Sequence, residues 1–119
     1  MLIKINMPDL VLDIDTAVPL GLIINELLTN SFKYASVKNK TGSINIELVE
    51  GVKGNYTLIF VDNGPGIDES INFDTAITLG LRLIKGLAAQ LYGEAKYHFD
   101  NGSCFTITFK DTATRKIED

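Results

Sequence analysis

The pattern of apolar and polar positions predicts a long helix in the first third of the chain. Between residues 17 and 35, apolar side chains recur at the three- and four-residue spacing of an α-helix, and Thr16 before them is a suitable N-cap. Pro19 then falls in the first turn, where proline is tolerated. The apolar positions are Leu20, Leu22, Ile23, Leu27, Leu28 and Phe32. We therefore expect much of this helix to be buried.

Shorter apolar stretches on both sides of this helix predict β-strands. Residues 44–48 alternate between apolar and polar side chains, and residues 56–61 form the next strand after a turn that contains two glycines. Residues 10–12, which precede the helix, have the composition of a further strand. Asp62 has the same parity as the buried positions of strand 56–61, so we expect its carboxylate on the face covered by helices.

The last third of the chain predicts a second helix and a hairpin. Apolar positions recur at helical spacing over residues 80–92, and Gly93 is a suitable C-terminal cap. Residues 94–99 and 103–109 then form two strands joined by a turn with an Asn-Gly step. Helices and strands mix without regular βαβ alternation. We therefore expect an α+β fold, a two-layer α/β sandwich with a mixed, mostly antiparallel sheet and helices on one face.

Composition is consistent with a single folded domain over residues 1–119. The chain has 119 residues, 45% of them hydrophobic, which is enough to close one core. Residues 68–77 are irregular, carry acidic side chains among apolar ones and are long for a turn, so they suit a lid. Residues 112–119 have the character of a frayed tail.

Charge and cysteine content narrow the classes of partner. A net charge of −4 argues against nucleic acid as the main partner, because backbone phosphates select basic surfaces. The single Cys104 excludes an internal disulfide and suits a reducing compartment, and no apolar run approaches the ~18–20 residues of a membrane span. We expect a cytoplasmic domain, whose parent protein is either membrane-anchored or soluble.

The first helix carries an unusual polar stripe. Glu26, Asn30 and Lys33 stand at positions i, i+4 and i+7, which share one helix face. In apolar surroundings an unpaired neutral amide alone costs on the order of 2–7 kcal/mol, and charged groups cost more. The stripe therefore needs a polar partner, and a metal-bound phosphate group would be a suitable one.

Two glycine-containing segments follow. Residues 61–67, Val-Asp-Asn-Gly-Pro-Gly-Ile, come directly after an apolar run, and residues 78–84, Thr-Leu-Gly-Leu-Arg-Leu-Ile, open the second helix. An aspartate before such a turn can be purely turn-forming, but Gly64 and Gly66 also allow the backbone to approach a ligand. Gly80 lies at a helix N-terminus, where free N–H groups suit phosphate.

These three segments resemble the N box (25–35), G1 box (61–67) and G2 box (78–84) of the ATP-binding domain of sensor histidine kinases. That domain belongs to a wider family with the gyrase, Hsp90 and MutL ATPases. The resemblance covers about residues 10–110 and is greatest to the two-component kinases with a compact lid, which tolerate a small hydroxyl residue such as Thr78 in place of the first G2 glycine. It implies a Bergerat-type ATP-binding fold.

The resemblance assigns roles to the N box. Asn30 matches the ligand of the Mg²⁺ that bridges the triphosphate, and an amide oxygen suits that cation. Lys33 matches a phosphate contact, and Tyr34 a residue that packs on adenine. Taken alone, these could be a buried amide, a solvated lysine and a core aromatic. Glu26 is the candidate catalytic residue, able to orient a water or accept a proton, with a structural pairing to Lys33 as the alternative.

Asp62 matches the carboxylate that accepts a hydrogen bond from the adenine amino group, the main base contact of the family. The resemblance implies further nucleotide contacts in the G1 box and the G2 box. These are Gly64, Gly66, Ile67, Thr78, Leu79, Gly80 and Leu81.

By this resemblance the chain is the ATP-binding catalytic domain of a bacterial two-component sensor histidine kinase, with ATP and Mg²⁺ as cofactors. It would donate the γ-phosphoryl group to a histidine on a separate dimerisation and phosphoacceptor domain, with a response regulator as an indirect partner. No segment matches that acceptor domain and His98 fits an ordinary surface residue, so we do not expect the isolated domain to autophosphorylate. The alternatives are a degenerate nucleotide-binding regulatory module, an ATPase switch, and a Ser/Thr-directed anti-sigma-type kinase.

Overall fold

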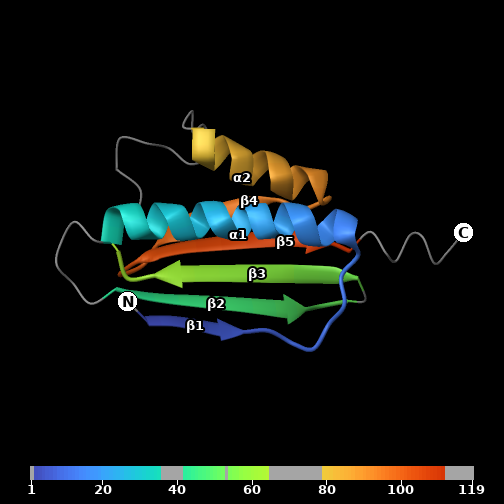
Figure 1. The fold of residues 1–119 in the computed structure, drawn as a ribbon, viewed down its shortest axis with the longest axis horizontal. Helices are drawn as coiled ribbons and strands as arrows, with labels where there is room; N and C mark the ends of the chain where they lie inside the picture. Colours follow the sequence, from blue (N-terminus) through green and yellow to red (C-terminus); the bar gives the residue numbers. More distant parts are fainter. Residues whose placement is uncertain (1, 36–41, 53, 65–78, 112–119) are drawn as a thin grey trace, which may run out of the picture.

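A computed structural model of the chain describes residues 2–35, 42–52, 54–64 and 79–111. Figure 1 shows the strands in one layer and both helices of these residues against the same face of that layer. The elements follow in the order β1 (Leu2–Asn6), α1 (Ile14–Ala35), β2 (Ser43–Glu50), β3 (Asn55–Asp62), α2 (Leu79–Gln90), β4 (Ala95–Phe99) and β5 (Ser103–Lys110).

The strands form one mixed sheet in the order β1-β2-β3-β5-β4. The pairs β2–β3, β3–β5 and β4–β5 are antiparallel, and β1 runs parallel to β2. A parallel pair needs a long crossover connection, which helix α1 provides here. The expected α+β sandwich with a mostly antiparallel sheet and helices on one face is confirmed.

The core lies between this sheet and the two helices. One row of side chains across the sheet joins Ile46, Phe60, Phe105 and Tyr97 on adjacent strands, and the first three are buried. They belong to one apolar cluster with residues of α1 and α2. Full burial of a side chain of this size contributes about 1.5–3 kcal/mol relative to exposure. The alternation predicted for residues 44–48 and 56–61 therefore has its cause in this one-sided core.

The prediction of a strand at residues 10–12 is wrong. These residues belong to the connection between β1 and α1, and Leu10 and Leu12 pack against the core without joining the sheet. The additional strand is β1, Leu2–Asn6, whose side chains are exposed throughout. Residues 3–6 alternate between isoleucine and a polar residue, so the sequence carries a short strand pattern here that the prediction left out.

Helix α1 begins at Ile14 and not at residue 17 as predicted. The carbonyl oxygen of Asp13 accepts hydrogen bonds from the N–H groups of Thr16 and Ala17, so Asp13 is the N-cap residue. Thr16 lies inside the helix, and its hydroxyl donates to Asp111 at 3.1 Å. Pro19 consequently falls in the second turn, where the buried face of a 22-residue helix outweighs its local cost of about 3 kcal/mol.

Helix α2 ends two residues before the predicted position 92, in a Schellman motif. Tyr92 takes the left-handed conformation with φ of 64°, and its N–H donates to the carbonyl of Ala89. The N–H of Gly93 then donates to the carbonyl of Ala88 at 2.9 Å. Gly93 thus helps to close the helix as predicted, although the residue with positive φ is Tyr92.

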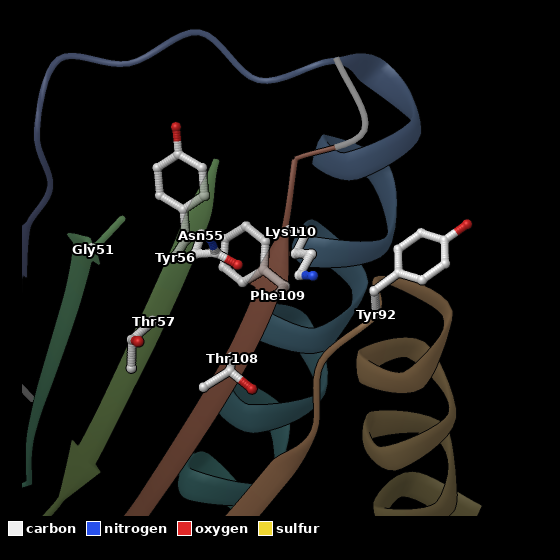
Figure 2. Close-up of a pocket in the computed structure, with 8 residues that line it drawn as sticks. All are labelled: Gly51, Asn55, Tyr56, Thr57, Tyr92, Thr108, Phe109 and Lys110. Carbon is white, nitrogen blue, oxygen red and sulfur yellow. The ribbon is translucent and has the colours of Figure 1, made fainter. Parts of the chain in front are cut away.

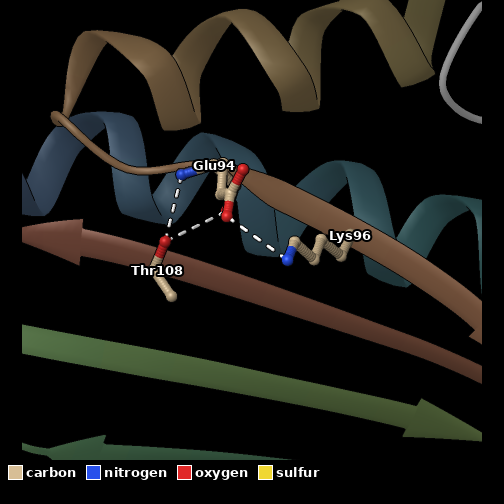
Figure 3. A network of polar contacts seen from close by, with 3 residues as sticks. All are labelled: Glu94, Lys96 and Thr108. Atoms are coloured by element: carbon tan, nitrogen blue, oxygen red, sulfur yellow. Dashed lines mark hydrogen bonds and ion pairs between the residues drawn. The ribbon is translucent and has the colours of Figure 1, made fainter.

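A close backbone approach explains the glycine at position 93. A Cβ atom there would lie 1.6 Å from the carbonyl oxygen of Thr108 in β5. Directly after it, the N–H of Glu94 donates to Thr108 Oγ1 at 3.1 Å, and Lys96 Nζ lies 3.5 Å from Glu94 Oε1 (Figure 3). The contacts of Gly93 and Glu94 with Thr108 join the start of β4 to the end of β5.

The remaining predicted strands are confirmed with small shifts at their ends. The predicted segments 44–48, 56–61, 94–99 and 103–109 correspond to β2, β3, β4 and β5. The predicted lid, residues 68–77, lies outside the described residues. In the described parts of the chain, no helix combines the length and apolar character needed to span a membrane.

Candidate functional site

The predicted site residues come from three segments of the fold. Among those with described side chains, Glu26 and Asn30 lie on α1, and Asp62 ends β3. Gly64 follows β3, while Gly80 and Leu81 stand in the first turn of α2. Of the others, Lys33, Tyr34 and Leu79 are placed in the two helices without a described side chain. Gly66, Ile67 and Thr78 lie outside the described residues.

The N-terminal turn of α2 packs against the polar stripe of α1. A Cβ atom on Gly80 would lie 3.1 Å from Glu26 Oε2 and about 4 Å from both terminal side-chain atoms of Asn30. Both side chains are half-buried. The structure thus brings the predicted N box and G2 box together, and the absence of a side chain at position 80 leaves room for Glu26.

Asp62 is a buried carboxylate with three hydrogen-bond donors. Its Oδ1 accepts from the N–H of Gly64 at 2.9 Å and from the N–H of Ser103 at 3.4 Å. Its Oδ2 accepts from the hydroxyl of Ser31 at 2.5 Å. The side chain is 7% exposed and lies on the helix-covered face of β3, as its parity predicted. These donors come from α1, the turn after β3 and the start of β5.

Sequence reasoning missed Ser31, Gly102 and Ser103. Ser31 follows Ile23 and Leu27 at four-residue intervals, so helical periodicity alone would have placed it on the buried face of α1. Gly102 and Ser103 come from the hairpin turn, and a Cβ atom on Gly102 would lie 2.0 Å from the carbonyl oxygen of Asp62. That approach joins residues about forty positions apart, which no local pattern reveals.

The amide oxygen of Asn30, the predicted metal ligand, fits Mg²⁺. Carboxylate and amide oxygens are hard ligands, and Mg²⁺ is usually held by one or two protein groups together with phosphate oxygens and water. Within the described ranges, no group of three or more His, Cys, Asp or Glu residues could hold a metal. A cation here would therefore take its other ligands from a phosphate chain and from water.

Residues 15–113 match the family of histidine kinase-, DNA gyrase B-, and HSP90-like ATPases. The chain belongs to this ATPase family. The matched range contains α1 from Asp15 onward, Asp62 and the start of α2, so all three predicted motifs lie within it. No curated protein sequence matches the chain.

Solved histidine kinases have the same fold as this ATPase domain. A histidine kinase domain from a blue-light activated histidine kinase of Erythrobacter litoralis gives a TM-score of 0.84 at 20% identity, over 97% of this chain and 54% of the other. For histidine kinase AdeS of Acinetobacter baumannii the TM-score is 0.73 at 23% identity, over 92% and 54%. Full-length ShkA in complex with AMPPNP gives 0.60 at 19% identity, over 92% and 25%. The chain thus spans about half or less of these proteins.

The lone histidine of this ATPase domain lies on β4, two strands away from Val61 of the G1 box in the sheet register. His98 is exposed on β4, opposite Cys104 of β5 in the sheet register. Its exposure agrees with the expectation of an ordinary surface residue.

A separate cavity of about 230 Å³ lies at the start of β3 (Figure 2), whereas Asp62 is the last residue of that strand. Next to it, the hydroxyl of Tyr56 donates to Glu50 at 3.3 Å. Burial raises the pKa of Tyr56, and the charges of Glu50 and Asp111 raise it further, so the phenol stays neutral. The lining residues are Gly51, Asn55, Tyr56, Thr57, Tyr92, Thr108, Phe109 and Lys110. None of the predicted site residues lines this cavity.

Proposed function

We propose that this chain is the ATP-binding catalytic domain of a two-component sensor histidine kinase. It binds Mg-ATP and donates the γ-phosphoryl group to a histidine on a separate dimerisation and phosphoacceptor domain. Membership of the ATPase family supports nucleotide binding, and the complex of the similar kinase ShkA with AMPPNP supports a triphosphate ligand.

One observation carries the proposal: three segments distant in sequence converge at one end of the sheet. The C-terminal half of α1 supplies Glu26, Asn30 and Ser31, and the end of β3 supplies Asp62. The first turn of α2 lies beside Glu26. A nucleoside triphosphate needs two kinds of contact. One is a buried hydrogen-bond acceptor for its base, and the other is a helix N-terminus for its phosphates, with an oxygen ligand for the cation beside it.

The roles follow from chemistry and position. Asp62 accepts a hydrogen bond from the adenine amino group, Asn30 offers an oxygen to Mg²⁺, and Lys33 and the α2 N-terminus bind phosphates. The cation, when bound, neutralises charge on the phosphates. In the transfer step the bond from the γ-phosphorus to the β-phosphate oxygen breaks, and a bond to an imidazole nitrogen forms. In this proposal Glu26 accepts the proton of the attacking group.

Nucleotide titration tests the first half of the proposal. Isothermal titration calorimetry with Mg²⁺ should show binding of ATP and ADP, with GTP much weaker. Guanine offers a carbonyl where adenine offers an amino donor, and the carboxylate of Asp62 has no hydrogen to give it. Equal affinity for GTP would contradict the role of Asp62.

Phosphoryl transfer tests the second half. The isolated chain incubated with labelled ATP should stay unlabelled, including His98, because the acceptor domain is separate. Joined to its acceptor domain, it should form an acid-labile, base-stable phosphohistidine. A label on serine or threonine would favour the anti-sigma-type kinase. Binding without any transfer would favour a degenerate regulatory module.

The Glu26→Gln variant of the parent kinase separates catalysis from structure at this residue. It keeps the shape of the side chain and removes the charge. We expect nearly unchanged ATP affinity and a transfer rate at least roughly tenfold lower, the low side of general-base effects. Weakened binding with an unchanged single-turnover rate would assign Glu26 a structural role.

A further inference from the structure

The hydrogen bonds of Asp62 leave little freedom to its carboxylate. Each carboxylate oxygen has about two acceptor positions. The N–H groups of Gly64 and Ser103 occupy both positions of Oδ1, and the hydroxyl of Ser31 occupies one position of Oδ2. Within the part of the chain that the structure describes, no further donor meets Oδ2, so one of its acceptor positions is left for a ligand.

Ser31 has equally little freedom. Its side chain is 4% exposed on a helix, and its hydroxyl donates to Asp62 Oδ2 at 2.5 Å. A serine hydroxyl has a single hydrogen, which Asp62 already receives. Toward any further partner the hydroxyl can therefore only accept hydrogen bonds. Ser31 and Asp62 together therefore form a pair that accepts hydrogen bonds from a ligand and donates none.

We propose that Ser31 is the positioning residue that makes this site select a 6-amino purine over a 6-oxo purine. The inference rests on the proposed function, since it deepens the account of the nucleotide site. Ser31 acts through Asp62: it fixes the plane of the carboxylate and commits its own hydrogen away from the ligand.

The physical reason lies in what would replace the hydroxyl. With alanine at position 31, a water can enter the space of the hydroxyl and donate one hydrogen to Asp62 Oδ2. That water has a second hydrogen, which it can donate to a carbonyl at the 6-position of the base. The wild-type pair cannot do this, so a 6-oxo purine leaves its carbonyl oxygen against acceptors, an arrangement that polar sites reject strongly.

The test compares ATP with inosine triphosphate, in which a carbonyl replaces the 6-amino group and the neighbouring N1 carries a hydrogen. Calorimetry with Mg²⁺ is carried out on the wild type, Ser31→Ala and Thr29→Ala. Thr29 is the matched control, because its hydroxyl also donates a hydrogen bond, to the carbonyl of Asn25 at 2.8 Å, but it is exposed on the same helix. We expect wild type and Thr29→Ala to prefer ATP by roughly 100-fold or more.

In Ser31→Ala the preference for ATP should fall by about tenfold or more, the size expected for a hydrogen bond to a charged group. An unchanged ratio of the two affinities, with both nucleotides weakened equally, would overturn the inference and leave Ser31 a merely structural residue. If the alanine variant does not fold, as judged by thermal unfolding, Ser31→Cys carries the test. Its thiol is a weak donor of similar size, so an intermediate ratio is expected and an unchanged ratio contradicts the inference. Absence of any ATP binding to the wild type would instead contradict the proposed function.

Discussion

Helix α1 delivers a hydroxyl to a buried aspartate near each of its ends. Near its start, Thr16 donates to Asp111 at 3.1 Å, and near its end Ser31 donates to Asp62 at 2.5 Å. The two hydroxyls stand about 22 Å apart along the helix at 1.5 Å per residue. Both aspartates are less than 10% exposed. By burial and pairing alone, the two sites look alike.

Their surroundings separate them. Asp111 also accepts from the N–H of Asp13 at 3.3 Å, so its charge lies against the N-terminus of α1, where the helix dipole favours it. Asp62 lies toward the other end of α1, where that dipole gives it no such support. A carboxylate that completes a helix N-terminus stabilises the fold. A carboxylate that is held rigidly and keeps an acceptor position open is suited to a ligand.

The largest loss of stability should come from the end of the molecule that contains Asp111. Gly93→Ala would place a Cβ atom 1.6 Å from the carbonyl oxygen of Thr108, so backbone must move. We expect the free energy of unfolding in urea to fall by about 3 kcal/mol or more, the upper range for overpacking. The control is Gly86→Ala in α2, whose Cβ would meet no described atom within 4 Å beyond its chain neighbours and the backbone of its own helix, so this variant should gain about 0.5–1 kcal/mol. Equal stability of the two variants would contradict this packing.

Asp111→Asn should lower stability without changing nucleotide affinity. The amide keeps the shape of the side chain but has no charge. The charge of Asp111 favours the start of α1 and strengthens the hydrogen bond from Thr16, so both effects are lost. The expected loss in a urea titration is roughly 1–2 kcal/mol. A weakened affinity for ATP in the folded variant would show that the two aspartates are not separate in function.

Gly80→Ala should lower the affinity for ATP and change the stability of the fold little, the opposite of the effect expected for Asp111→Asn. Its Cβ atom would meet the flexible end of Glu26 at 3.1 Å, and alanine favours the helix, so the free energy of unfolding should change by less than about 1 kcal/mol. Phosphates need a close backbone approach at this helix start, so ATP affinity should fall by roughly tenfold, the equivalent of one good hydrogen bond. AMP, titrated in parallel, should bind the variant and the wild type equally. A matching loss for AMP would place the effect at the base.

Tyr56→Phe should have the smallest effect, visible at alkaline pH. The pKa of Tyr56 is raised above its ordinary value of 10.0 by burial and by Glu50 and Asp111, so the folded state favours the neutral phenol. The wild type therefore keeps this contribution below pH 10 and loses it as the pH rises through the raised pKa. Thermal unfolding from pH 8 to pH 11 should show a steeper decline for wild type than for Tyr56→Phe. Parallel declines would contradict the assignment.

The sequence revealed those parts of the fold that one-sided burial imprints on the chain. The alternation of β2 and β3 and the apolar faces of both helices were readable because each element packs one side against a single core. Strand β1 has the same alternation at Ile3 and Ile5, but it is exposed and short, and the prediction left it out. The start of α1 was misplaced because Asp13 is its cap and Thr16 is held by a residue 95 positions away.

The candidate site divides in the same way. Asp62, Glu26, Asn30 and Gly80 could be proposed from the sequence because each belongs to a local motif with fixed spacing. The hydrogen bonds to Asp62 from Ser31 and Ser103 were not, because they join α1 and β5 to the end of β3 and depend on the tertiary fold.

The most direct test of the account is the affinity of Mg-ATP for Asp62→Asn, measured by calorimetry beside Asp111→Asn. The amide of asparagine presents either a donor or a weaker acceptor to the adenine amino group, and the charge-assisted hydrogen bond is lost. The account predicts that Asp62→Asn remains folded and loses ATP affinity by roughly 10–100-fold, as expected for a hydrogen bond to a charged group, while Asp111→Asn binds as wild type does. Equal affinity in wild type and Asp62→Asn would contradict the assignment of the nucleotide site to this end of the sheet.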